Sequence, residues 1–260
     1  MTREKVNILG VLVDPINMDM ALEIVDNWIQ TRCKNFVCFR DVHGLVRSQR
    51  EPDLKLIHNR AGLVSPDGMP LVWVMRRKGH AKVGRVYGPD FMLETFARSV
   101  EKGYRHYLYG GTPPVLEKLL SRLTDQFPGV EIVGAESPPF RALTETEDQD
   151  VIERINACRP DIVWIGLGSP KQERWMDAHI ARLEAPVLCG VGAAFDFHAG
   201  VKLQAPRWIQ RCGFEWLFRM ITEPRRLAGR YLVNNPLFLI HLTLQLTGLR
   251  EYPAPTQPPP

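Results

Sequence analysis

Three glycine-bearing loops that follow predicted strands are the first residues able to do chemistry. The loop Gly166-Leu-Gly-Ser-Pro-Lys-Gln-Glu173 opens a predicted helix, where free backbone N–H groups favour an anion such as a phosphate. Gly190-Val-Gly-Ala-Ala-Phe-Asp196 and Gly110-Gly111-Thr112 also permit close approach of a nucleotide or a sugar. The candidate binding residues are Gly110, Gly111, Gly166, Gly168, Lys171, Gln172, Gly192 and Asp196. Glycine-rich turns with helix caps are the alternative interpretation, and Lys171 in place of the third glycine breaks the GxGxxG dinucleotide fingerprint.

A carboxylate after another predicted strand is a candidate general base. Pro66-Asp67-Gly68 holds Asp67 in a tight turn, and burial and neighbouring charges can tune the pKa of such a carboxyl group for proton transfer. Gly68 beside it would let a substrate approach closely. An Asp-Gly turn is also common for purely conformational reasons, so the turn alone does not identify a catalytic site.

The sequence predicts no metal site. Asp148-Gln149-Asp150 has the D-x-D form that can hold a divalent ion on a nucleotide diphosphate, but it begins a predicted helix, where acids complement the helix dipole. The seven histidines lack the spacing of HExxH or a comparable ligand set. Neither a GxSxG nucleophile elbow nor a P-loop occurs in the sequence.

Strands and helices must alternate to place these loops. The predicted strands are 6–13 (one or two strands around Gly10), 35–39, 63–65, 104–109, 130–134, 162–167 and 186–191. The predicted helices are 17–29, 43–61 with a break near Pro52, 91–101, 115–126, 146–158 and 170–183. This alternation predicts an α/β fold with a doubly wound, mainly parallel sheet and helices on both faces. In such sheets, ligands bind outside the carboxyl ends of the strands.

The C-terminal part of the chain differs in composition from the rest. After about Lys202, seven basic residues alternate with aromatic ones, and Glu215 and Glu223 are the acids among them. We expect residues 1–201 to form the α/β core and 202–252 a helical basic appendage that lies on an anionic membrane surface. A terminal helix packed on its own domain is the alternative. Residues 253–260 are Pro-rich and predict a disordered tail.

Composition excludes several classes of protein. The 260 residues include 45% hydrophobic and 24% charged ones, as in globular proteins. A net charge of +4 is too small for a dedicated nucleic-acid binder, so no nucleic-acid partner is expected. Five scattered cysteines argue against a disulfide framework and for a reducing cytoplasm. The apolar segment 236–249 is shorter than the roughly 20 residues that cross a bilayer, and the N-terminus lacks a signal-peptide core.

An ordered set of motifs resembles the WecG/TagA/CpsF glycosyltransferases (glycosyltransferase family 26) over about residues 6–240. The motifs are Ser65-Pro-Asp-Gly68, Arg85-Val-Tyr-Gly-Pro-Asp90, Tyr107-Leu-Tyr-Gly-Gly111, Gly166-Leu-Gly-Ser-Pro-Lys-Gln-Glu173, Gly190-Val-Gly-Ala-Ala-Phe-Asp-Phe-His-Ala-Gly200, Ala205-Pro-Arg-Trp208 and Glu215-Trp-Leu-Phe-Arg-Met-Ile-Thr-Glu-Pro-Arg-Arg226. The resemblance implies an inverting, metal-independent enzyme that moves a sugar from a UDP-sugar to a sugar on a polyprenyl diphosphate. It also implies action at the cytoplasmic face of the bacterial membrane, in exopolysaccharide or other surface-polymer synthesis, and self-association into a homo-oligomer.

The same resemblance assigns roles to single residues. It makes Asp67 the catalytic base, places Gln172 in the pocket, and gives Arg219 and Arg226 the role of catalytic arginines on a segment that closes over the site. A third matching position holds Gly229, with Arg230 beside it.

One departure bears on the sugar. Family members that make the N-acetylmannosamine linkage usually carry T-x-N where this chain has Phe39-Arg40-Asp41. We therefore expect Asp41 to meet a different substrate, with glucose favoured and N-acetylmannosamine or its uronate next. Two alternatives from other classes are a noncatalytic membrane scaffold that binds lipid-linked sugar and a nucleotide-dependent oxidoreductase.

Overall fold

The main sheet of the structure, a computed structural model that describes residues 4–255, has six strands. They are β3 (Asn35–Arg40), β4 (Leu63–Pro66), β5 (Arg105–Gly110), β6 (Glu131–Glu136), β7 (Ile162–Gly166) and β8 (Val187–Gly190), in the order β4-β3-β8-β7-β5-β6. The pairs β3–β8, β8–β7, β7–β5 and β5–β6 are parallel. The predicted α/β fold with a mainly parallel sheet is confirmed. Apolar runs such as Ile162–Ile165 are fully buried, as expected where helices cover a parallel sheet.

The chain forms two compact units. The first consists of residues 4–18, 39–87 and 203–255, and the second of residues 19–38 and 88–202. The division at residue 201 into a core and an appendage stays a prediction. Of the predicted Pro-rich tail, residues 256–260 lie outside the described part of the chain.

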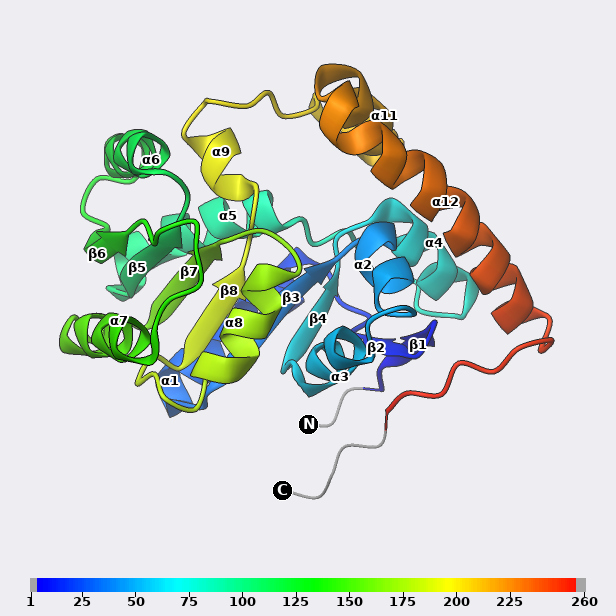
Figure 1. Cartoon of the computed structure of the whole chain (residues 1–260), viewed down its shortest axis with the longest axis horizontal. Helices are drawn as coiled ribbons and strands as arrows, with labels where there is room; N and C mark the ends of the chain where they lie inside the picture. The colour runs from blue at the N-terminus through cyan, green and yellow to red at the C-terminus, as the bar shows by residue number, and fades with distance from the viewer. Residues whose placement is uncertain (1–3, 256–260) are drawn as a thin grey trace. The chain divides into compact units, whose positions relative to one another are not determined.

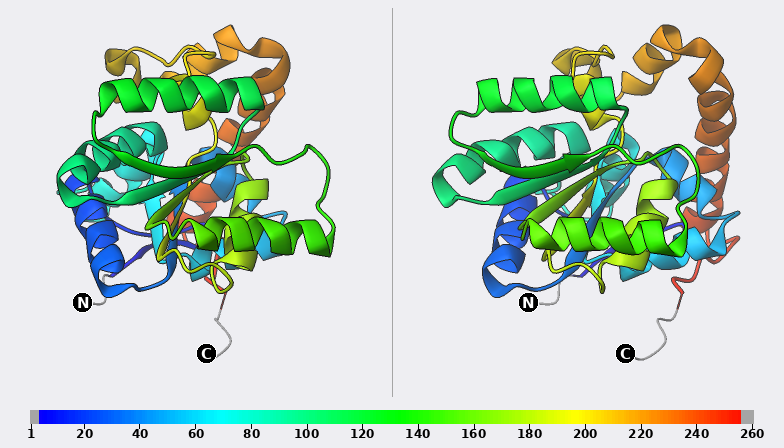
Figure 2. Two further views of the ribbon diagram at one scale, coloured as in Figure 1. Left: turned by 90° about the vertical axis from the view of Figure 1, so that its left-hand side faces the viewer. Right: turned by 60° about the vertical axis from the view of Figure 1, so that its left-hand side comes forward.

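The second unit contains most of the sheet and its covering helices. The helices are α1 (Met18–Thr31), α5 (Gly88–Lys102), α6 (Pro113–Gln126), α7 (Glu145–Ala157), α8 (Lys171–His179) and α9 (Ala194–His198). α1 and α5 cover one face of the strands, and α7 and α8 cover the other (Figures 1 and 2). Helix α1, for example, buries an apolar stripe at helical spacing with Leu22, Val25 and Ile29. The short helix α9 is not anticipated by the sequence pattern.

The first unit combines a hairpin with helices from both ends of the chain. It contains β1 (Val6–Ile8), β2 (Val11–Val13), α2 (Val42–Arg47), α3 (Pro52–Arg60), α4 (Met69–Arg77), α10 (Arg207–Arg211), α11 (Glu215–Thr222) and α12 (Pro224–Leu246), together with β4. The antiparallel hairpin turns at Leu9 and Gly10, whose φ angles of 53° and 79° suit a primed turn. The predicted break near Pro52 is confirmed, because Pro52 begins α3. α4 lies in a segment for which the sequence analysis predicts no helix.

The long helix α12 packs within this unit, against α2 and the hairpin (Figure 1). Near its middle, Asn234 Nδ2 donates to His43 Nδ1 over 2.9 Å. Near its end, Gln245 Oε1 accepts from the Leu9 backbone N–H over 3.0 Å. Asn7 Nδ2 then donates to the Tyr252 carbonyl over 2.9 Å, so the chain after α12 also returns to the hairpin. Within residues 4–255, no helix combines the length and the apolar character that a membrane crossing requires.

Candidate active site

Asp67 lies where the main chain leaves β4, at the wall of a cavity of about 1020 Å³ in the first unit. The backbone N–H groups of Asp67 and Gly68 both donate to the Arg40 carbonyl, over 3.0 and 3.2 Å, which fixes the turn after the strand. The Asp67 side chain is 19% exposed. The structure thus holds a mostly buried carboxylate at the end of a strand, facing a space large enough for a substrate.

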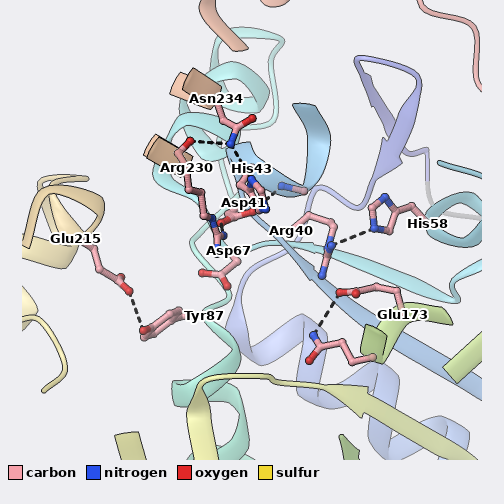
Figure 3. A network of polar contacts seen from close by, with 12 residues as sticks. Arg40, Asp41, His43, His58, Asp67, Tyr87, Glu173, Glu215, Arg230 and Asn234 are labelled. Atoms are coloured by element: carbon pink, nitrogen blue, oxygen red, sulfur yellow. Dashed lines mark hydrogen bonds and ion pairs between the residues drawn. The ribbon is translucent and has the colours of Figure 1, made fainter. Parts of the chain in front are cut away.

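Arg85 links Asp67 to a second carboxylate, Glu215 on α11. Arg85 Nη2 lies 3.1 Å from Asp67 Oδ1 and 2.5 Å from Glu215 Oε2, and Arg85 Nε donates to the Asp67 carbonyl. Tyr87 donates its hydroxyl to Glu215 Oε1 over 2.8 Å (Figure 3). The Arg85 guanidinium lies over the Tyr87 ring. One arginine is therefore shared by two acids that are 148 residues apart in the sequence.

Asp41 also lines the cavity, and both of its carboxylate oxygens have protein partners. Oδ1 accepts from the Gly44 backbone N–H over 2.8 Å and caps the N-terminus of α2. Oδ2 pairs with Arg230 Nη2 on α12 over 2.9 Å (Figure 3). Asp41 thereby joins α2 to α12 at the cavity wall.

The two arginines predicted to be catalytic lie in different surroundings. Arg219, on α11, lines the cavity that contains Asp67. Arg226, near the start of α12, pairs with Glu223 over 2.6 Å, is half exposed, and is not among the residues lining that cavity. The structure thus brings Asp41, Asp67, Gly68 and Arg219 together but leaves Arg226 outside.

The glycine-bearing loops belong to the second unit, where several glycines are required by packing. A side chain at Gly110, whose φ is 133°, would come within 2.6 Å of the Gly166 backbone. A side chain at Gly166 would come within 2.5 Å of the Phe195 ring, and one at Gly111, with φ 70°, would be in ordinary contact with the same ring. Gly168, with φ 75°, faces open space. Close packing alone explains Gly110 and Gly166, as the alternative interpretation expected.

Gln172 is the most buried polar candidate in these loops. Its side chain, 4% exposed, donates from Nε2 to the Gly190 carbonyl over 2.8 Å, and Gly192 lies beside its Oε1. Within the described residues, Oε1 is buried and has no hydrogen-bond partner. Lys171 is exposed on the same helix turn, and Asp196 pairs with Lys202 over 2.5 Å.

The D-x-D segment is part of a helix start, as the sequence analysis favoured. Thr144 and Glu147 form a capping box at α7. Asp148 accepts from Arg182 over 2.6 Å and contacts His179 over 2.8 Å. In the part of the chain that the structure describes, no group of three or more His, Cys, Asp or Glu residues is arranged to hold a metal ion.

Comparison with known proteins assigns the chain to a family. Residues 6–252 match the glycosyl transferase WecG/TagA/CpsF family. The chain belongs to this family. Its relatives include the N-acetylglucosaminyldiphosphoundecaprenol N-acetyl-beta-D-mannosaminyltransferases of Staphylococcus aureus strains NCTC 8325 / PS 47 and COL. Each is 28% identical over 246 residues, which cover 90% of this chain and 91% of the relative. The chain is therefore a glycosyltransferase, as the motifs predict, and not a nucleotide-dependent oxidoreductase.

Burial and charges in this glycosyltransferase's cavity shift the pKa of Asp67. Burial raises the pKa of Asp67, Arg85 opposes that rise, and the nearby Glu215 and Asp41 carboxylates add to it, so that the pKa lies at about 7. A carboxyl group with this pKa exchanges protons readily at neutral pH.

Asp41 has the opposite character, because Arg230, His43 and the Gly44 N–H outweigh the effect of its burial and lower its pKa. Burial and Arg230 also lower the pKa of His43, to about 4, so this histidine is neutral at physiological pH. Two carboxylates of one WecG/TagA/CpsF cavity thus differ in protonation, which is a common arrangement in active sites.

Sequence reasoning did not single out Arg85, Tyr87, Glu215 or Arg230 as members of this site. Arg85 and Glu215 open two of the motifs that carry the family resemblance, so the signal for their importance is present in the sequence. Their role depends on a contact between distant segments, which only the fold reveals.

Proposed function

We propose that this glycosyltransferase moves a hexose from a UDP-sugar to a sugar carried on a polyprenyl diphosphate, with Asp67 as the general base. The observation that carries the proposal is the buried Asp67 carboxyl group, whose pKa lies at about 7, at the wall of a cavity that also contains Arg85 and Arg219. An inverting transfer needs one base at the acceptor hydroxyl and positive charge at the leaving diphosphate. Both requirements are met by residues of this cavity.

The reaction then proceeds in one displacement. Asp67 takes the proton from the acceptor hydroxyl while that oxygen attacks the anomeric carbon of the donor from the face opposite UDP. The bond between the anomeric carbon and the diphosphate oxygen breaks, and UDP leaves with the electron pair. Arg219, whose guanidinium stays charged because nearby Tyr231, Tyr87 and Glu215 raise its pKa against the effect of burial, stabilises the departing diphosphate.

We further propose that transfer requires no metal ion and takes place at the cytoplasmic face of the membrane. Arg219 supplies the positive charge that a divalent ion would otherwise bring to the diphosphate. The relatives from Staphylococcus aureus are named for an undecaprenol-linked acceptor, which is a membrane lipid, and the basic-aromatic segment after Lys202 suits an anionic surface.

Two donors compete in this proposal. The names of the relatives favour UDP-N-acetylmannosamine. The Phe39-Arg40-Asp41 sequence, with Asp41 ion-paired to Arg230, favours a plain hexose, and UDP-glucose is our preferred donor.

A donor panel tests the function. UDP release is measured in the presence of EDTA with UDP-glucose, UDP-N-acetylmannosamine or UDP-glucuronate, with and without a short-chain prenyl-diphosphate sugar acceptor. We expect acceptor-dependent release with one donor, and loss of most turnover but not of donor binding in Asp67→Asn. Release that needs added metal, or normal turnover of Asp67→Asn, would contradict the proposal.

A further inference from the structure

The cavity that contains Asp67 continues well beyond the residues that the transfer reaction needs. Its far part lies between α4 and the second half of α12 and is lined by Trp73, Val74, Phe238, Leu239, Leu242 and Leu246. We call this part the α4–α12 trough. Phe238, Leu239, Leu242 and Leu246 recur at helical spacing, so that one stripe of α12 faces the cavity.

The trough is long, and much of its apolar surface is open. From Arg230, which contacts Asp41, to Leu246 at the end of the trough, α12 rises by about 24 Å. Trp73 is 50% exposed, Leu239 63% and Leu246 56%, although these side chains are large and apolar. Apolar side chains that are exposed along a cavity wall mark a binding surface for an apolar ligand.

The charges around the trough are complementary to an anion. Arg76, Arg77 and Lys78, exposed at the C-terminal end of α4, line the same cavity. The lining acids are Asp41, Asp67 and Glu215, and each already contacts Arg230 or Arg85. The ligand that fits combines a long apolar chain with phosphate groups.

We propose that the α4–α12 trough holds the isoprenoid chain of the acceptor, with the basic end of α4 facing phosphate. This inference rests on the proposed function and specifies where the lipid part of the acceptor binds. The chain runs along the stripe of α12 away from Asp67, so that the sugar it carries stays at the base. The phosphate is either the acceptor's own diphosphate or a neighbouring lipid headgroup, and the experiment below separates these sources.

The first arm of the test compares acceptors that differ only in their lipid. The wild-type enzyme is given the same sugar diphosphate on a methyl group and on a farnesyl chain, both in solution without a membrane. We expect a roughly tenfold or larger preference in kcat/KM for the farnesyl acceptor, since burial of two methylene groups already amounts to that factor. Leu239→Asp should remove this preference by lowering kcat/KM for the farnesyl acceptor.

Ile240→Asp is the matched control. Ile240 is the next residue of α12, is 55% exposed, and is not among the residues lining the cavity. It should keep the preference for the farnesyl acceptor. An equal loss of the farnesyl preference in the two variants, or no such preference in the wild type, would refute lipid binding in the trough while leaving the proposed function intact. Failure of every acceptor would instead count against the proposed function.

A second arm needs no turnover. Farnesyl diphosphate with a photoreactive terminal group is crosslinked to the protein, and the labelled peptide is identified by mass spectrometry. Labelling of α4 or the second half of α12 is expected, and labelling elsewhere would refute the inference. Competition by free pyrophosphate would assign the basic end of α4 to the diphosphate. Competition only by phosphatidylglycerol vesicles would assign it to a headgroup.

Discussion

Replacing Glu215 by Gln should shift the pH dependence of the reaction, because Glu215 lines the same cavity as Asp67 and shares Arg85 with it. The substitution keeps the size of the side chain and its hydrogen bond from Tyr87, but removes a negative charge near Asp67. Glu215 is one of the groups that raise the pKa of Asp67. The loss also frees Arg85 to pair with Asp67 alone, which acts in the same direction.

The size of the shift follows from the geometry. Arg85 Nη2 lies 3.1 Å from one carboxylate oxygen and 2.5 Å from the other, so these oxygens are at most about 5.6 Å apart. Two unit charges at that distance repel by just under 1 kcal/mol in a water-like medium and by about 3 kcal/mol at an effective dielectric constant of about 20. The pKa of Asp67 should therefore fall by about 0.5 to 2 pH units.

The assay is the pH profile of kcat/KM, which reports ionisations of the free enzyme. A base must be deprotonated to act, so the rate rises with pH through the pKa of Asp67. In Glu215→Gln this acidic limb should move to lower pH by the stated amount. Glu117→Gln, which removes an exposed carboxylate of α6, should leave the limb in place. An unmoved limb in Glu215→Gln, or one that moves to higher pH, would refute the coupling of Glu215 to the base.

Three further predictions concern single residues. Arg219→Ala should lower kcat by about 100-fold or more, as loss of a charge-stabilising donor does. The loss of kcat in Arg226→Ala should be at least tenfold smaller, because of these two arginines only Arg219 lines the cavity. Equal losses in steady-state kinetics would contradict this prediction. The pKa of Asp67 is about 7 in the folded state, against an ordinary value of 3.8, so Asp67 binds its proton more tightly in the folded than in the unfolded protein. The free energy of unfolding of the wild type, relative to that of Asp67→Asn, should therefore fall as pH rises from about 4 to 7, by at most about 4 kcal/mol. Urea unfolding of both proteins across this pH range measures the difference in free energy of unfolding. A difference that does not change with pH would contradict the prediction. Gly110→Ala should destabilise the protein by about 1–3 kcal/mol more than Gly103→Ala. Both glycines have positive φ, but of the two only Gly110 would place an added Cβ atom within 3 Å of another backbone segment. Thermal unfolding of the two variants measures the effect. Equal losses of stability would show that packing at Gly110 is unimportant.

The periodic parts of the fold could be read from the sequence because they depend on local patterns. Buried strands such as β7 are continuous apolar runs, and Pro52 marks the start of α3. α4 was missed because Gly68 and Pro70 at its start are typical of turns, and because its buried side is completed by contacts with β4. Pro70 in fact occupies the first turn of the helix, where its lack of an N–H costs nothing.

The candidate site was predictable to a smaller extent. Asp67 could be named because it follows a strand in a family motif, but its raised pKa comes first from burial and then from Glu215 and Asp41, and all three depend on the tertiary structure. The same holds for Asp41, whose pairing with Arg230 joins positions 189 residues apart. Local sequence identifies a carboxylate, whereas distant segments determine its chemistry.

The attachment of α12 at both ends has a mechanical consequence for the cavity. Arg230 fastens the beginning of the helix to Asp41, and Gln245 fastens its end to the hairpin. A helix pinned in this way forms a fixed wall. The wall of the cavity also includes α11, which is tied through Glu215 to Arg85 and Tyr87. Widening of the cavity for a bulky substrate therefore requires movement of α11. The Glu215–Arg85 contact, which affects the pKa of Asp67, must break when the cavity opens in this way.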